Sequence, residues 1–227
     1  MKRRQFSAVT VIGLAPVLGL GAAGSAWALS EGDAASGVRA ALERGANAAV
    51  AALGRNDGFL GNPKVRIELP GFMKDAAKWL KAAGQGRRVD ELVTAMNRAA
   101  EAAVPEAKVL LVSAAKSMSV EDALRIVRGG DTSVTDFFSA KTRQPIEQKF
   151  LPIVSRATEK VSLAQKYDAI AGKAAGIGLM KKEDADLKGY VTNKALDGLY
   201  LLIAEEERNI RRDPIGSGSA ILRKVFG

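Results

Sequence analysis

The stretch VDELVTAMNRAAEAAVPEAKVLLVSAAKSM, residues 89–118, places an apolar side chain at nearly every third or fourth position. Such spacing is typical of an amphipathic helix that buries one face. The apolar positions are Val89, Leu92, Val93, Met96, Ala99, Ala100, Ala103, Ala107, Leu110, Leu111, Ala114 and Met118. Pro105 lacks an amide hydrogen, so it leaves the Glu101 carbonyl without its helical donor. The stretch therefore predicts one long central helix that is kinked at Pro105.

The sequence on both sides of this central helix also has helical spacing. Helices are predicted over residues 30–53, 71–83, 120–128, 145–163, 187–210 and 221–226, and around Phe137 and Phe138. Ser119 with Asp122 resembles a capping box for the helix that starts at residue 120. Asp131 or Thr132 is expected to cap the helix that follows, and Pro152 is expected to kink or restart a later one.

Residues 55–70 break the helical period. RNDGFLGNP, residues 55–63, consists largely of turn-forming residues, and KVRIELP, residues 64–70, alternates apolar and polar side chains as a strand does. A single strand has no partner elsewhere in the sequence, and an isolated strand is not stable. We therefore predict an extended loop that packs Val65, Ile67 and Leu69 onto the helices.

The composition agrees with a helical interior. Apolar residues make up 47% of the 227-residue chain, but aromatic residues only 5%, so the core must be built from Ala, Val, Leu and Ile. Small side chains of this kind favour closely packed helices. No internal repeat or low-complexity linker divides the chain. We expect an all-α fold, a single-domain helical bundle over residues 29–227 with one long Pro-kinked central helix and an extended loop near 55–70.

Residues 1–28 have the order of a signal peptide: the basic run Lys2-Arg3-Arg4, an apolar stretch over 8–23, and the small-residue cleavage motif Ala26-Trp27-Ala28. Cleavage is expected between Ala28 and Leu29. The run RRQF, residues 3–6, resembles a twin-arginine leader, and a general secretory leader is the alternative. The mature protein is expected in the periplasm, with no transmembrane anchor after processing.

The sequence contains neither cysteine nor histidine. This absence excludes thiolate nucleophiles, disulfides, Ser-His-Asp triads and the common zinc and haem ligands. Only an all-oxygen Ca²⁺ or Mg²⁺ site would remain, and no EF-hand pattern is present. Glu205, Glu206 and Glu207 are consecutive, so on a helix they point in different directions and predict a solvated, ion-paired face. No metal and no cofactor are therefore expected.

The formal charge is +9, of which the leader contributes three. A basic exported domain has anionic lipid, lipopolysaccharide and peptidoglycan as available partners, so an anionic envelope component is the partner that this charge suggests. Solubility alone is the alternative explanation of the charge. Nucleic acid is not an expected partner, because export separates the protein from it.

The most unusual polar cluster lies on the central helix just before Pro105. Asn97 and Glu101 are one turn apart, with Arg98 between them. One interpretation is a polar groove between helices formed by Asn97, Arg98, Glu101, Asp122 and Asp131. The other is structural: these side chains would satisfy backbone groups freed at the kink, or pair with Asp122 or Asp131. No catalytic residue is assigned by either interpretation.

Several separated motifs in one order resemble a known family. They are DGFLGNP (57–63), MNRAAEAA (96–103), EDAL (121–124) with GGDT (129–132), and KVFG (224–227). They are similar to the exported bacterial family catalogued as domain of unknown function 4197. The resemblance implies an all-helical periplasmic domain. Many members look like lipoproteins, but this chain lacks the cysteine such anchoring needs, so a soluble periplasmic state is expected. The family has no established activity, so the resemblance supplies no catalytic residues.

Two functional hypotheses follow. The first is a non-enzymatic binding or envelope-associated protein that uses the predicted polar groove. The alternative is a carboxylate-dependent hydrolase or transferase that acts on an envelope glycan. It would use paired carboxylates such as Glu101 and Asp131, roughly 5 to 10 Å apart across an open cleft, or a Ser-Lys arrangement.

Overall fold

A computed structural model of the chain describes residues 31–160 and 186–213, together with residues 165 and 176. Every regular element in this part is a helix, which confirms the predicted all-α fold. The elements are α1 Glu31–Leu53, α2 Gly71–Ala82, α3 Gly86–Ala103, the 3-10 turn η1 Val104–Glu106, α4 Ala107–Lys116, α5 Val120–Arg128, α6 Ser133–Glu159 and α8 Leu187–Arg212. The predicted leader, its cleavage site at Ala28 and Leu29, and the predicted helix at 221–226 lie outside the described residues.

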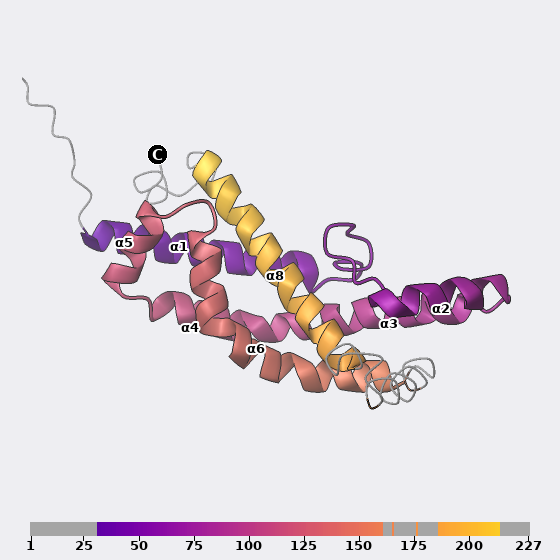
Figure 1. Cartoon of the computed structure of the whole chain (residues 1–227). Helices are drawn as coiled ribbons and strands as arrows, with labels where there is room; N and C mark the ends of the chain where they lie inside the picture. Colours follow the sequence, from indigo (N-terminus) through magenta and orange to yellow (C-terminus); the bar gives the residue numbers. More distant parts are fainter. Residues whose placement is uncertain (1–30, 161–164, 166–175, 177–185, 214–227) are drawn as a thin grey trace, which may run out of the picture.

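The helices form a bundle in which α8 crosses over α1 and α6 and packs on both (Figure 1). The helix α3 packs on α6 and α8, and α4 packs on α1 and α6. A short turn joins α2 to α3, and this hairpin extends away from the body of the bundle (Figure 1). The loop between α1 and α2 lies beside the place where α8 passes α3 (Figure 1).

The apolar positions predicted at 89–118 are largely buried, but they belong to two helices. The turn η1, which contains Pro105, separates α3 from α4. Met96, Ala100, Ala103 and Leu111 are fully buried on either side of it. The central element is therefore a helix interrupted at Pro105, and the kink itself stays a prediction.

The helix α6 differs from its prediction, because it continues without a break through Pro145 and Pro152. Each proline removes one hydrogen bond to the carbonyl four residues earlier. Those carbonyls belong to Lys141 and Gln148, which are exposed residues, so water can satisfy them. A continuous buried face holds the helix together; it contains Val134, Phe138, Thr142, Ile146, Phe150 and Val154.

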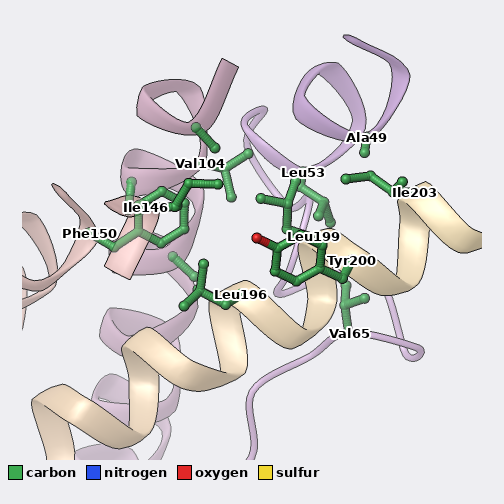
Figure 2. Close-up of a cluster of buried hydrophobic side chains, with 14 of the residues drawn as sticks. Ala49, Leu53, Val65, Val104, Ile146, Phe150, Leu196, Leu199, Tyr200 and Ile203 are labelled. Carbon is green, nitrogen blue, oxygen red and sulfur yellow. The ribbon is translucent and has the colours of Figure 1, made fainter. Parts of the chain in front are cut away.

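The core is built from small aliphatic residues and a few large ones, as the composition indicates. Figure 2 shows side chains of α8, among them Leu196, Leu199 and Ile203, that point toward the neighbouring helices. Phe59, from the loop between α1 and α2, is fully buried. It lies against α8 at Gly198, where an added Cβ atom would come within 2.8 Å of the Phe59 ring. This close approach anchors the loop to the bundle.

Replacing either of two helical glycines by alanine is expected to change the stability of the fold, but in opposite directions. Gly198→Ala should destabilise the fold by about 1–2 kcal/mol, because the buried Phe59 ring must move. Gly45→Ala, in α1, should stabilise it by up to about 1 kcal/mol, because the new Cβ atom would lie 3.8 Å from the nearest atom of Glu206, an ordinary contact. Urea unfolding of both variants tests this. Equal effects of the two substitutions would show that the contact with Phe59 is not tight.

Candidate functional site

The loop between α1 and α2 is held on α3 by a buried amide. Asn97 Oδ1 accepts a hydrogen bond from the Ile67 amide at 2.8 Å, and Asn97 Nδ2 donates to the Ile67 carbonyl at 2.9 Å. The same Nδ2 donates to the Val93 carbonyl at 2.8 Å. Asn97 thus gives Ile67 both of the bonds that a neighbouring strand would give. This pairing explains how an extended segment is stable without a strand beside it.

A buried carboxylate holds the beginning of the same loop. Glu101 Oε1 accepts hydrogen bonds from the amides of Phe59, at 3.0 Å, and Leu60, at 3.1 Å. Glu101 Oε2 accepts from Arg98 at 2.6 Å, and Arg98 also donates to Asp57 at 2.8 Å. The hydrogen bond to Glu101, followed by that to Asp57, raises the pKa of Arg98. Asp57 has a φ of 61°, a left-handed conformation that Asp adopts more readily than most residues.

We call Asn97, Arg98 and Glu101 the polar clamp. The structure brings these three predicted site residues together, but they bind the chain's own loop, and Asn97 and Glu101 are sealed from solvent. Their structural role differs from the predicted one. Asn97 and Glu101 form hydrogen bonds with backbone groups of residues 59–67, and none of the three residues pairs with Asp122 or Asp131 in the described part of the chain. The space predicted as a groove is filled by the loop.

The other two predicted site residues lie at the opposite end of the bundle, near α5 (Figure 1). The Asp122 amide donates to the Ser119 hydroxyl at 3.0 Å, which confirms the predicted Ser119 cap, and the Asp122 carboxylate pairs with Arg125 at 3.4 Å. Asp131 is exposed in the turn between α5 and α6. The five residues therefore do not line a common groove, and Glu101 and Asp131 do not face each other across a cleft.

Sequence reasoning missed a groove on the outer side of the loop. Val65, Ile67 and Leu69 are buried, as predicted, so Lys64, Arg66 and Glu68 are turned outward and exposed. Together with the start of α2 and one face of α8, this segment encloses a groove of about 350 Å³. Its lining consists of Lys64, Val65, Arg66, Glu68, Leu69, Lys74, Tyr190, Lys194, Asp197, Gly198 and Leu201. We call it the basic groove.

The acidic groups of the basic groove are already neutralised. Glu68 pairs with Arg66 at 2.9 Å, and Asp197 pairs with Arg143, which lies outside the lining, at 2.8 Å. Two ammonium groups in the lining, those of Lys74 and Lys194, have no carboxylate partner among the residues that the structure describes. The groove therefore presents an excess of positive charge to a ligand.

A third cation, Lys64, lies at the end of the basic groove that is farther from Tyr190. It pairs with Glu205 of α8 at 2.8 Å. At the near end, the Tyr190 hydroxyl donates to the Glu68 carbonyl at 2.9 Å. Burial raises the pKa of the Tyr190 phenol, and the Lys194 nitrogen lies 5.9 Å from the centre of its ring. The extended segment and α8 thus run in opposite directions and are tied together at both ends of the groove.

A second cleft, of about 430 Å³, lies between α5 and α6. Ile126 and Phe137 supply apolar surface, and the charged groups of the lining are Asp122, Arg125, Asp136 and Lys141. The Asp122 carboxylate pairs with Arg125, and the Asp136 carboxylate accepts from the Thr132 hydroxyl at 3.2 Å. Positive and negative groups balance here, so this cleft lacks the charge excess of the basic groove.

Within the described residues, no group of three or more acidic side chains is placed to hold a metal ion. In the same part of the chain, no helix combines the length and the apolar character that are needed to span a bilayer. The basic groove could not be found from sequence spacing, since its cations are distributed over residues 64–194. The one local signal was the outward alternation of Lys64, Arg66 and Glu68.

Comparison with known proteins identifies one relationship. Residues 28–227 match the model of a family described as a protein of unknown function (DUF4197). Neither the curated proteins nor the solved structures contain a match to this chain.

Proposed function

We propose a binding function for this chain, which belongs to the DUF4197 family over residues 28–227. In this proposal it is an exported, non-enzymatic protein of the periplasm that binds an anionic component of the cell envelope in the basic groove. One observation carries the proposal. The two carboxylates of the groove are neutralised by arginines, whereas the ammonium groups of Lys74 and Lys194 have no acidic partner in the described part of the chain.

The physical basis is a concave surface with one sign of uncompensated charge. Such a surface concentrates counter-ions and raises their rate of association. Each lysine near an anionic surface contributes about 1 kcal/mol of attraction at physiological ionic strength. The predicted leader would place the domain beside anionic headgroups, and the charge of +6 that would remain after its removal (+9 less the three of the leader) acts in the same direction.

Vesicle binding tests this function. Vesicles that contain phosphatidylglycerol should retain the protein in co-sedimentation, and vesicles of phosphatidylcholine alone should not. The double substitution Lys74→Gln with Lys194→Gln should weaken binding by about thirtyfold, because two lysine contributions of about 1 kcal/mol each are lost. Increasing the salt concentration should weaken binding of the unaltered protein in the same way.

A matched control separates the groove from net charge. Lys108→Gln with Lys116→Gln removes the same charge from α4, where both residues are exposed and outside the groove. This variant should bind within about threefold of the unaltered protein, since distant exposed charges are screened. Equal losses in the two double variants would mean that net charge alone carries binding, and the proposal would be rejected. Equal binding to both vesicle types would reject it as well.

A further inference from the structure

We infer that the ligand of the basic groove is an anionic amphiphile, with a phosphate or similar headgroup and an alkyl chain, bound as a single molecule. This inference rests on the proposed function and specifies its ligand class. Its basis is the apolar floor between the cations, to which Val65, Leu69, Gly198 and Leu201 contribute. Leu201 is 37% exposed, so it presents apolar surface to the groove.

The floor is held in place by close packing. Gly198 has no side chain, and Phe59 and Val65 lie directly against it, at 2.8 Å and 3.2 Å from the position that a Cβ atom would take. Both of these residues are buried and packed in the core. Gly198 is itself buried under these two residues, so the loop packs tightly onto α8 at the centre of the groove. An alkyl chain would cover the apolar surface that Leu201 still exposes, whereas a free anion would leave it in contact with water.

The charges and the floor are arranged in a line. Lys194, Gly198 and Leu201 lie at positions i, i+4 and i+7 of α8 and so share one face. The Lys194 and Leu201 positions are about 10 Å apart along the helix axis. Lys194, whose nitrogen lies 5.9 Å from the centre of the Tyr190 ring, marks the headgroup end, and Leu201 lies toward the end where Lys64 pairs with Glu205. Lys74 contributes a second cation to the same groove. A headgroup at the first end would direct an alkyl chain along α8 toward Leu201.

A chain-length series tests the inference with soluble probes. Inorganic phosphate and butyl, hexyl and octyl phosphate are titrated by calorimetry below their micelle concentrations, with octyl glucoside as the uncharged probe. Each methylene that is buried strengthens binding by about fourfold. Octyl phosphate should therefore bind at least about tenfold more tightly than butyl phosphate, and octyl glucoside should bind more weakly than octyl phosphate.

The substitution Leu201→Gln tests whether the apolar floor itself contributes to binding. It should lower the affinity for octyl phosphate by on the order of tenfold and leave that for butyl phosphate unchanged, because only the longer chain reaches Leu201. Leu151→Gln is the matched control, since Leu151 is 42% exposed on α6 and lies outside the groove. It should change neither affinity. Circular dichroism verifies that both variants keep the fold.

The outcomes separate the two proposals. If inorganic phosphate and all alkyl phosphates bind equally, and Lys74→Gln with Lys194→Gln weakens them, the groove binds anions and the amphiphile inference is overturned. If octyl glucoside binds as tightly as octyl phosphate, or if no anion binds at all, the proposed function fails with it. Equal losses in Leu201→Gln and Leu151→Gln would also overturn the inference, because the floor would then have no specific role.

Discussion

Glu101→Ala is expected to lower the free energy of unfolding by about 3 kcal/mol. The substitution leaves the amides of Phe59 and Leu60 without an acceptor, and the first of these is buried. A buried donor that loses its partner costs about 1–3 kcal/mol. The loss of the ion pair adds little, because Arg98 is 35% exposed and keeps Asp57 as a partner.

Urea unfolding at neutral pH measures this cost, and two further variants identify its origin. Glu101→Gln keeps an oxygen for the two amides but places an amide group against Arg98, so it should lose about half as much. Glu91→Ala removes an exposed carboxylate of the same helix, which pairs with Arg87 at 3.4 Å, and should cost under about 0.5 kcal/mol. A loss below 1 kcal/mol for Glu101→Ala would contradict the view that the polar clamp holds the loop.

Glu207→Ala is expected to have an effect of similar or larger size, about 3–5 kcal/mol. Glu207 of α8 accepts the amides of Val134, at 3.1 Å, and Thr135, at 3.2 Å. It therefore caps the first turn of α6 from another helix. It also pairs with Arg211 at 3.0 Å, where the two side chains are 2% and 15% exposed. Removing the carboxylate would leave two amides unpaired, one of them buried, and would take the Glu207 carboxylate from the largely buried Arg211 guanidinium.

The two preceding residues are natural controls for Glu207. Glu205 and Glu206 form surface ion pairs with Lys64 and Arg44, and such pairs contribute under about 1 kcal/mol. Thermal and urea unfolding of the three single alanine variants should therefore separate position 207 from positions 205 and 206. Equal losses at the three positions would mean that the cap from α8 does not stabilise α6.

The helices could be predicted from sequence because their apolar spacing is what the bundle buries. The pattern at 30–53 and 187–210 agrees with α1 and α8 to within two residues at each end. The loop at 55–70 was predictable for the same reason, since its alternation places Val65, Ile67 and Leu69 inward. These features depend on local periodicity, which sequence displays directly.

Features that depend on distant partners could not be predicted in this way. The expected cap of α6 by Asp131 or Thr132 is one example: Thr132 is the first flanking residue, but its side chain makes no capping bond, and Glu207 supplies the acceptor from 73 residues away. Glu207 was expected on a solvated face and is 4% exposed. Such pairings follow from how α8 crosses α6, which the spacing within either helix does not specify.

The candidate site shows the same division. The cluster at Asn97, Arg98 and Glu101 was recognisable as unusual, but its partners are backbone groups of residues 59–67, and backbone groups carry no signature in the sequence. The basic groove depends on the loop, α2 and α8 meeting in space. The polar clamp and the basic groove are connected, because the clamp holds the segment that forms one wall of the groove.

The most direct test of the basic groove as a binding site is a nuclear magnetic resonance titration of the isotope-labelled protein with hexyl phosphate. Amide shifts are expected to concentrate in residues 64–69, around Lys74, and in residues 190–201, and the double substitution Lys74→Gln with Lys194→Gln is expected to weaken them. Shifts confined to the cleft between α5 and α6, around Ile126 and Phe137, would contradict the assignment of the basic groove as the binding site. The absence of shifts anywhere would contradict the proposed function itself.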